Sequence, residues 1–360
     1  MPRLKHLLIR GVNWLGDAIM TLPALQRLRE AHPHTRFTLL THEKLADLWR
    51  GQPIIDHVME FKDGDSPRAI GRRLRREDIQ AALILPNSTR AALETWCARI
   101  PRRIGYAARW RRLFLTETLP TRPGHMPMHK PDPSEIERRL ANDEHPRELP
   151  PTAHHIHHYL HLAATLGADP DPVPPQIIIP IREIVKLEKK FKLPPDTKRL
   201  AIIPGAEYGP AKRWPAAQFA ATAKLIHEQH KTHTLLLGGP ADQAIANEIA
   251  ATLQPETVTD LTGRTTLREL AAALAASHCV LTNDTGPMHL AAAVDTPVVA
   301  LFGSTNPGLT APGLPGHGKI QILRTPPPCA PCFLRECPID TRCLKNITVE
   351  SVTTTIERIL

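Results

Sequence analysis

The sequence predicts an α/β fold built from two doubly wound domains, and three observations lead to this prediction. The chain has 360 residues, more than one hydrophobic core usually serves. Short apolar runs alternate with segments of helical period in both halves, a pattern typical of parallel sheets covered by helices. Four prolines within residues 170–175 mark a linker between the halves.

The elements of the first half follow from this alternation. Leu4–Arg10 is an apolar run that predicts a buried strand, and Ala18–Ala31 predicts a helix with one apolar face. Thr121–Pro151 is polar, rich in His and Pro, and aperiodic, so we expect an irregular excursion of the first domain. A helix is expected at His154–Leu166. The further strands expected are Phe37–Thr41, Val58–Phe61 and Ala82–Leu85.

The second half repeats the alternation, which predicts a second nucleotide-binding type of sheet. We expect domains at 1–172 and 173–345, with a C-terminal helix within 346–360 that packs back toward the first domain. The strands expected are Leu200–Ile203, Thr234–Leu237, Val258–Asp260, Cys279–Thr282 and Val298–Phe302. The helices expected are Pro215–Gln229, Ala241–Thr252, Leu267–Ala276, Pro287–Val294 and Val349–Leu360.

The composition narrows the class of protein. No apolar run reaches the roughly 18 residues of a membrane span, and the first residues form too short an apolar core for a signal peptide. We therefore expect a cytoplasmic protein. The net charge is +9, which favours an anionic partner, although a solvated basic surface explains it equally well. Aromatic residues are only 4% of the chain, which argues against a surface that stacks single-stranded bases.

The charge excess includes two arginine clusters, and four of the six cysteines lie close together. The cysteine spacing, Cys329-x2-Cys332-x4-Cys337-x5-Cys343, indicates first a structural zinc site or a loop staple in a reducing compartment, and second disulfides. The arginine clusters are Arg72, Arg73, Arg75 and Arg76, and then Arg99, Arg102, Arg103, Arg109, Arg111 and Arg112.

Three segments carry candidate chemistry. The turn from Arg10 to Asp17 follows the first strand and lacks a dinucleotide glycine fingerprint; Asp17 either compensates a helix dipole or acts chemically. The loop Pro204–Pro215 offers two glycines and Lys212 to a phosphate, or is an ordinary loop. Asn283–His289 begins a small-residue helix, which predicts an anion site or simply a well-capped terminus.

Together with Leu85-Pro86-Asn87-Ser88, Ile100–Tyr106 and the four-cysteine loop, these segments occur in an order that resembles glycosyltransferase family 9. This family comprises the ADP-heptose:lipopolysaccharide heptosyltransferases, and the resemblance is greatest to its heptosyltransferase II branch. It covers nearly the whole chain, least well at 121–150. The resemblance implies a GT-B fold, in which two Rossmann-like domains face a central cleft, and an inverting glycosyltransferase.

The implied reaction moves L-glycero-D-manno-heptose from ADP-heptose onto the first heptose of the lipopolysaccharide inner core. The implied acceptor is heptosyl-Kdo2-lipid A, met at the cytoplasmic face of the inner membrane. No cofactor is required, although Mg²⁺ is compatible with the chemistry, and a monomer is expected. Transfer to another core position is the alternative within the family.

The resemblance also assigns residues. Asp17 falls on the family's catalytic aspartate. The donor-binding set is Lys212, Asp284, Thr285, Gly286, His289, Thr265, Glu207 and Asp242. The acceptor-binding set is Asn87, Arg102, Arg103 and Arg109.

Two other classes compete with this assignment. A nucleotide-sugar epimerase needs a dinucleotide glycine fingerprint and a Tyr-x-x-x-Lys pair, and neither is present. A basic, zinc-containing nucleic-acid-binding protein would explain the charge and the cysteines, but not the glycine–proline loops that follow strands. We therefore expect no nucleic-acid partner.

Overall fold

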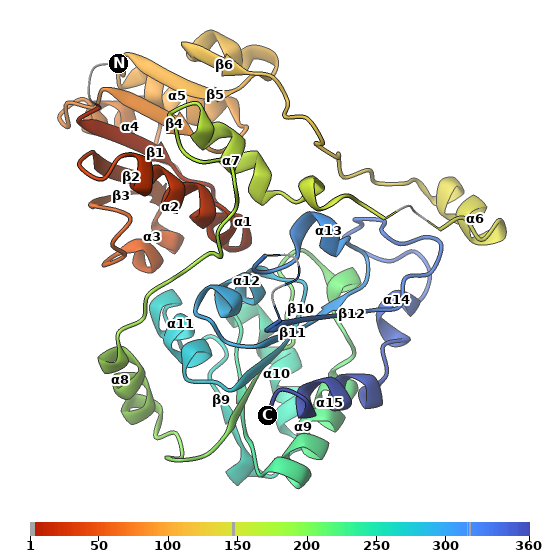
Figure 1. Cartoon of the computed structure of the whole chain (residues 1–360). Helices are drawn as coiled ribbons and strands as arrows, with labels where there is room; N and C mark the ends of the chain where they lie inside the picture. Colours follow the sequence, from red (N-terminus) through yellow and green to blue (C-terminus); the bar gives the residue numbers. More distant parts are fainter. Residues whose placement is uncertain (1–3, 146–147, 315, 317) are drawn as a thin grey trace. The chain divides into compact units, whose positions relative to one another are not determined.

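The computed structural model describes residues 4–145, 148–314, 316 and 318–360, with only the backbone of Arg109. These residues form two compact units (Figure 1). The first comprises the chain up to His125 together with Thr152–Gln176, and the second comprises Met126–Pro151 and Ile177–Leu360. The predicted boundaries at 172 and 345 stay predictions.

The first unit contains a six-stranded sheet in the order β3-β2-β1-β4-β5-β6, with every pair parallel. Its central strand is buried on both faces because Leu7, Leu8 and Ile9 are apolar and fully enclosed. The strands are β1 (His6–Arg10), β2 (Arg36–His42), β3 (His57–Phe61), β4 (Ala81–Ile84), β5 (Arg102–Tyr106) and β6 (Glu117–Leu119).

Helices connect these strands, and their starts follow the local sequence. Ser66 caps α4 by accepting a hydrogen bond from the Ala69 N–H, and Pro67 takes the first helical position. The helix expected at Ala18–Ala31 is divided in two, because Pro23 has no N–H to donate to the Ile19 carbonyl. The helices are α1 (Leu15–Met20), α2 (Leu22–Ala31), α3 (Glu43–Trp49), α4 (Pro67–Leu74), α5 (Thr89–Cys97), α7 (Ile156–Ala164) and the 3₁₀ segments η1 (Arg109–Phe114) and η2 (Pro151–Ala153).

The second unit has the same topology. Its parallel sheet has the order β12-β11-β10-β7-β8-β9. The strands are β7 (Arg199–Ile203), β8 (His233–Leu236), β9 (Val258–Asp260), β10 (Cys279–Asn283), β11 (Val298–Phe302) and β12 (Ile320–Arg324). The helices are α6 (Pro133–Ala141), α8 (Ile181–Phe191), α9 (Ala216–His230), α10 (Gln243–Ala250), α11 (Leu267–Ala275), α12 (Gly286–Ala293), α13 (Pro307–Thr310), α14 (Arg342–Lys345), α15 (Val349–Glu357) and the 3₁₀ segments η3 (Pro210–Lys212), η4 (Pro240–Asp242) and η5 (Pro255–Thr257).

Both sheets therefore have the doubly wound strand order of nucleotide-binding folds. The predicted α/β class with two such sheets is confirmed. Three strands escaped prediction: β5 begins with two arginines, β6 has three residues, and β12 is a half-exposed edge strand. None of them is the continuous apolar run that predicts a buried strand.

The core of the second unit extends to the C-terminus. Trp214 and Phe219 pack edge to face, with ring centroids 5.0 Å apart. Val352 and Ile356 of α15 belong to the same core, and α15 lies alongside α9 (Figure 1). The predicted packing of 346–360 toward the first domain stays a prediction.

The segment expected to be an irregular excursion contains α6. Asp132 caps this helix by accepting a hydrogen bond from the Glu135 N–H at 3.0 Å, and Pro133 occupies its first position. The segment Met126–Pro151 is grouped with the second unit. The capping signal was present in the sequence, although the surrounding His and Pro residues obscured the helical period.

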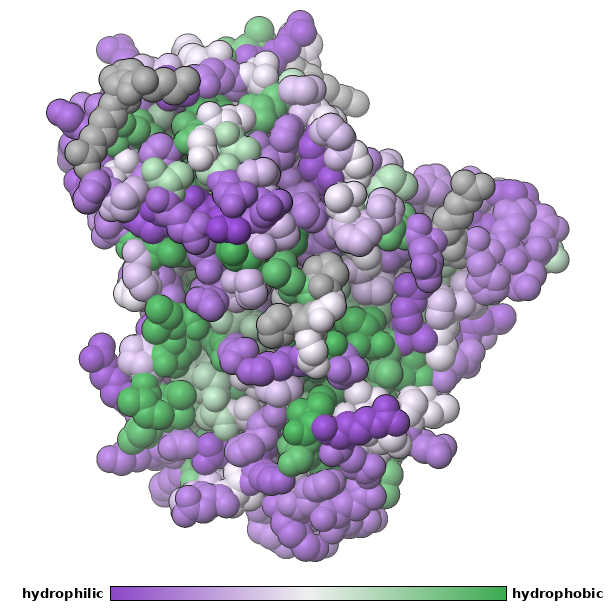
Figure 2. Space-filling view, viewed as in Figure 1, coloured by the Kyte–Doolittle hydropathy of each residue, from purple (hydrophilic) through white to green (hydrophobic). Residues whose placement is uncertain are grey.

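Polar side chains cover most of the face shown in Figure 2, with apolar side chains in patches between them. Among the described residues, no helix combines the length and the hydropathy needed to cross a bilayer.

Candidate functional site

The second sheet reverses its winding direction between β7 and β10, which are neighbouring strands. Ligands of doubly wound folds bind at such a reversal, beyond the carboxyl ends of the strands. The loop 204–215 follows β7, and the segment 283–286 joins β10 to α12. The two segments predicted to bind the donor therefore meet at the expected place.

Lys212 and Asp284 join these two segments. The Lys212 Nζ lies 2.6 Å from Asp284 Oδ2, and the Thr305 hydroxyl donates to the same oxygen at 2.5 Å. The Lys212 side chain is 16% exposed and that of Asp284 is 6% exposed. An ammonium has three N–H donors. Because one of them is directed to Asp284, the others can reach an anionic ligand.

The loop that carries Lys212 is held by a buried neighbour of Asp284. Asn283 accepts a hydrogen bond from the Trp214 backbone N–H at 3.0 Å and donates to the Pro204 carbonyl at 2.7 Å. The Trp214 indole is fully buried and donates to the Ile347 carbonyl at 3.0 Å. One amide thus ties the beginning and the end of the loop to β10, which fixes where Lys212 can reach.

The start of α12 lies beside this pair. Thr285 is its N-cap residue, Gly286 its first residue, and His289, in the next turn, is buried. The N–H groups of a first helical turn have no acceptor within the helix, and the helix dipole favours an anion there. The structure therefore brings Asp284, Thr285, Gly286 and His289 together with Lys212.

Asp242 lies over the same loop. A β-carbon on Gly205 would be 2.2 Å from the Asp242 carboxyl carbon, so this glycine is required by close approach. Asp242 also accepts a hydrogen bond from the Gly239 N–H at 3.0 Å, and its other oxygen lies 3.8 Å from Arg213 Nη2. Asp242 therefore lies against the loop that carries Lys212, and its donor-binding role stays a prediction.

The two remaining predicted donor residues lie at its edge. Glu207 is exposed in the loop after β7, and Thr265 is half-buried in the loop before α11. The loop of Thr265 approaches the β8–α10 connection, since the Gly263 N–H donates to the Gly238 carbonyl at 3.0 Å.

The four-cysteine loop packs against the loop that carries Lys212. The Arg335 carbonyl accepts a hydrogen bond from the Ala211 N–H at 3.1 Å, and the Tyr208 hydroxyl donates to the Phe333 carbonyl at 2.7 Å. Gly209 permits this contact, because a β-carbon there would be 2.4 Å from the Arg335 carbonyl oxygen. The four-cysteine loop therefore helps to fix the shape of the loop that carries Lys212.

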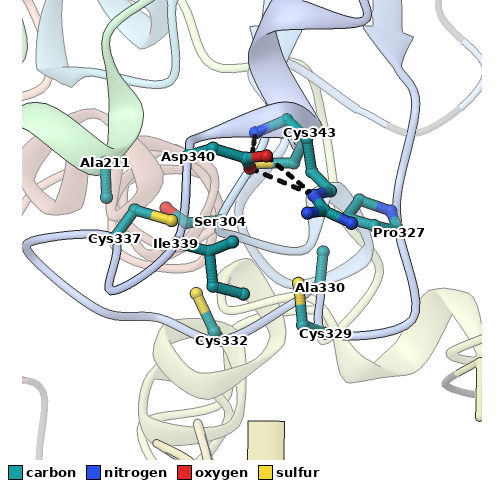
Figure 3. A pocket seen from close by; sticks show the side chains of 11 residues that line it. Ala211, Ser304, Pro327, Cys329, Ala330, Cys332, Cys337, Ile339, Asp340 and Cys343 are labelled. Carbon is teal, nitrogen blue, oxygen red and sulfur yellow. Dashed lines mark hydrogen bonds and ion pairs between the residues drawn. The ribbon is translucent and has the colours of Figure 1, made fainter. Parts of the chain in front are cut away.

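All four cysteines line one small cavity of about 20 Å³ (Figure 3). They are free thiols, and burial raises the pKa of Cys343 to about 12, so its thiol stays protonated at neutral pH. No three His, Cys, Asp or Glu side chains within residues 4–145, 148–314, 316 and 318–360 are placed to share a metal ion. The geometry of Cys329, Cys332, Cys337 and Cys343 therefore does not support a zinc site.

In the first unit, Asp17 lies in the first turn of α1 and is half-buried. Trp14 is the N-cap residue, so Asp17 is not the capping side chain. Its negative charge contributes to raising the pKa of the buried Tyr159, after the larger effect of burial. Asp17 therefore lies near α7, at the reversal between β1 and β4.

A buried ion pair fixes the turn that precedes Asp17. The Arg10 Nε lies 2.7 Å from Glu94 Oε2, and both side chains are enclosed. Arg10 also donates to the Asn13 side chain at 3.1 Å and to the Gly11 carbonyl. The rigid turn sets the direction of α1 and hence the position of Asp17.

Asn87 follows β4 and is held by a buried arginine. Arg111 Nη1 donates to the Asn87 side chain at 3.3 Å and to the Tyr106 carbonyl at 2.8 Å. Burial lowers the pKa of Arg111 to about 10. His158 stacks on Tyr106 with centroids 4.0 Å apart, and burial lowers the pKa of His158 to about 3. The Asn87 amide nitrogen lies 3.4 Å from His158 Nε2. Asn87 is therefore oriented by the neutral imidazole of His158 and by the Arg111 guanidinium.

The predicted acceptor arginines are not brought together with Asn87. Arg102 and Arg103 begin β5, so they lie at the edge of the sheet opposite the carboxyl end of β4. Arg102 forms a bidentate pair with Glu117, at 2.7 and 3.1 Å. Arg103 donates to the carbonyls of Phe114 and Ile100. The Arg109 side chain lies outside the described residues.

Three residues of these sites were missed by sequence reasoning. Arg111 stands in the cluster with Arg109 but gives no separate signal, and Tyr106 appears only as the end of the segment Ile100–Tyr106. Thr305 follows β11 and bonds to Asp284. Its position after a buried strand was the available signal, because carboxyl ends of neighbouring parallel strands share an edge.

Comparison with known proteins assigns the family. The model of glycosyltransferase family 9 (heptosyltransferase) matches residues 133–342, more than half of the chain. The chain belongs to glycosyltransferase family 9. It is a glycosyltransferase, and the alternative of a nucleic-acid-binding protein is without support.

Curated members of the family resemble the chain over most of their length. It is 30% identical to lipopolysaccharide heptosyltransferase 2 of Salmonella typhimurium, with 85% of each chain covered. It is 29% identical to lipooligosaccharide heptosyltransferase 2 of Haemophilus influenzae, with 85% of this chain and 86% of that protein covered. The solved structure of Escherichia coli ADP-heptose lipopolysaccharide heptosyltransferase II matches with a TM-score of 0.78 and 25% identity, over 99% and 98% of the two chains. The GT-B fold predicted for this family 9 member is confirmed.

Proposed function

We propose that this glycosyltransferase moves a heptose from ADP-heptose onto the first heptose of the lipopolysaccharide inner core, as a heptosyltransferase II. One observation carries the donor half of the proposal. Lys212, Asp284 and the start of α12 converge at the winding reversal of the second sheet, where a diphosphate finds a cation and helix N–H groups. The names of the similar relatives support the choice of sugar and acceptor.

In this proposal, Asp17 accepts the proton of the acceptor hydroxyl as its oxygen attacks the anomeric carbon of the donor. A new C–O bond forms, the bond to the β-phosphate breaks with its electron pair leaving on ADP, and the anomeric configuration inverts. Lys212 and the first turn of α12, with Thr285, Gly286 and His289, stabilise the charge that grows on the leaving diphosphate. Asp284 orients the Lys212 ammonium.

The remaining proposed contacts follow from position. Asp242, beside Gly205, suits the ribose hydroxyls of ADP, while Thr265 and Glu207 border the nucleotide and sugar. Asn87 would bind acceptor hydroxyls through the amide that Arg111 orients. Since heptosyl-Kdo2-lipid A is anchored in a membrane, we include peripheral contact with the inner membrane and action by a monomer in the proposal.

Product mass tests this function. The protein is mixed with ADP-heptose and with lipid A cores that carry zero, one or two heptoses. We expect one added heptose on the one-heptose core alone. Product from the zero-heptose core alone would make the chain the enzyme for the first heptose, and no product from any core would overturn the proposed donor.

A further inference from the structure

A basic groove lies in the first unit. It is an open cavity of about 790 Å³ between α4 and α5. The helices touch at Gly71, where a β-carbon would be 2.6 Å from the Cys97 Cβ. The groove is lined by Ser66, Arg68, Arg72, Arg75, Trp96, Cys97, Arg99 and Arg103.

The lining holds five arginines and no carboxylate. In the part of the chain that the structure describes, Arg68, Arg72 and Arg99 form no ion pair, and all three are exposed. Arg75 is anchored by a hydrogen bond from its Nε to the Cys97 carbonyl at 2.9 Å. Five like charges around one groove repel one another unless an anion enters, so the groove is complementary to a polyanionic surface.

Apolar side chains project beside these charges. Trp96 is 50% exposed, and its ring meets that of Phe114 edge to face at 5.8 Å. Phe114 belongs to η1, which packs against α5 and also carries Trp110 and Leu113, 75% and 62% exposed. Residues three apart lie on one side of a 3₁₀ helix. Trp110 and Leu113 therefore form one exposed apolar edge next to the groove.

The combination of arginines with exposed apolar side chains indicates which kind of anion the groove binds. A free sugar phosphate needs cations but has no use for exposed tryptophan and leucine. Tryptophan prefers the boundary between lipid headgroups and acyl chains, and arginines near an anionic leaflet add electrostatic attraction. We propose that the arginine groove and the Trp96, Trp110 and Leu113 edge form a docking surface for an anionic lipid bilayer.

One end of the groove lies away from the proposed chemistry. Trp96 and Arg99 lie at the end of α5, and Arg103 begins β5, so these residues occupy the edge of the sheet opposite Asn87. The inference rests on the proposed function only in that the acceptor is lipid-linked. Binding to vesicles that contain no acceptor therefore tests it independently of transfer.

The test is co-sedimentation of the full chain with phosphatidylcholine vesicles, with and without phosphatidylglycerol. We expect binding only to the anionic vesicles, weakened by salt. Each basic residue near such a surface contributes about fivefold in affinity, so Arg68→Gln, Arg72→Gln and Arg99→Gln combined should weaken binding by about 100-fold. The double variant Trp110→Ala, Leu113→Ala keeps the charge of the protein and should also bind the anionic vesicles more weakly.

The matched control removes three exposed charges elsewhere, as Arg182→Gln, Lys189→Gln and Lys224→Gln, and should leave binding within about twofold. Transfer to a delipidated, water-soluble acceptor should be unchanged in the groove variant, which also shows that it folds. Equal loss in both triple variants, equal binding to neutral vesicles, or displacement by inorganic phosphate at matched ionic strength would overturn the proposal.

Discussion

The two sheets share one strand order but use charge differently at their winding reversals. In the second unit, the buried Asp284 pairs with Lys212, whose side chain remains partly accessible. In the first unit, the cations are enclosed: Arg10 is paired with Glu94, and Arg111 donates to Asn87 and backbone carbonyls. The same topology thus yields a partly accessible ion pair in one unit and an enclosed one in the other.

This difference assigns the tasks of the reaction. An ammonium at the surface can bind a diphosphate without breaking the fold, because its partner Asp284 keeps the Thr305 hydroxyl. The enclosed Arg10–Glu94 pair cannot separate to bind a ligand, since an unpaired buried charge is strongly destabilising. We infer that the second unit binds the donor charge and that the first unit positions the base, Asp17.

Replacing the base should have the largest effect on catalysis. We expect Asp17→Asn to lower kcat by about 10²–10⁴-fold, the range contributed by a positioned general base, because the amide cannot accept the hydroxyl proton. Steady-state transfer assays measure this change, with circular dichroism to establish folding. A kcat within threefold of the unchanged protein would remove Asp17 from the chemistry.

Removing the accessible cation should come next. Lys212→Met is expected to lower kcat/KM by about 10²-fold, comparable to the loss of one stabilising donor at a developing anion. Lys130 is the matched control, since its Nζ also approaches the Tyr208 ring, at 5.6 Å, against 5.2 Å for Lys212. If Lys130→Met lost as much activity as Lys212→Met, the special place of Lys212 would be refuted.

Breaking the enclosed Arg10–Glu94 pair should lower the stability of the protein. Glu94→Gln leaves the Arg10 guanidinium without its charge partner, and we expect the free energy of unfolding to fall by about 3–5 kcal/mol. Urea denaturation measures the loss, with the exposed pair Arg50–Glu60 as control. Glu60→Gln should cost at most about 1 kcal/mol. Equal costs for the two variants would contradict the contrast between enclosed and exposed charge.

The smallest expected effect is on the free energy of unfolding at acidic pH. Burial lowers the pKa of His155 to about 4, below its ordinary value of 6.5. The unfolded chain therefore binds the proton more readily, so this stability is complete above pH 6.5 and is lost as the pH falls toward 4. We expect His155→Gln to recover about 1–2 kcal/mol of the loss between pH 7 and 5. The exposed His34→Gln should recover none, and identical pH profiles would refute the assignment.

The sequence was most informative where segments are apolar and periodic. The central strands, such as Leu4–Arg10, were predictable because burial on both faces demands continuous apolar residues. The meeting of the Lys212 loop with the start of α12 was predictable too, since glycines, a lysine and a helix start follow buried strands. The Arg111–Asn87 contact was not, because it joins residues 24 positions apart through a side chain whose burial no local pattern reveals. Arg102 and Arg103 are conspicuous in the sequence, but whether they lie near Asn87 depends on which end of β5 they occupy.

Titration of ADP into the purified protein and its variants, followed by calorimetry, separates the tasks assigned to the two units. The division predicts that Lys212→Met weakens ADP binding by at least about tenfold, whereas Asp17→Asn binds ADP within about twofold of the unchanged protein while failing in transfer. Unchanged ADP affinity in Lys212→Met, or an equal loss in Asp17→Asn, would contradict a donor site confined to the second unit.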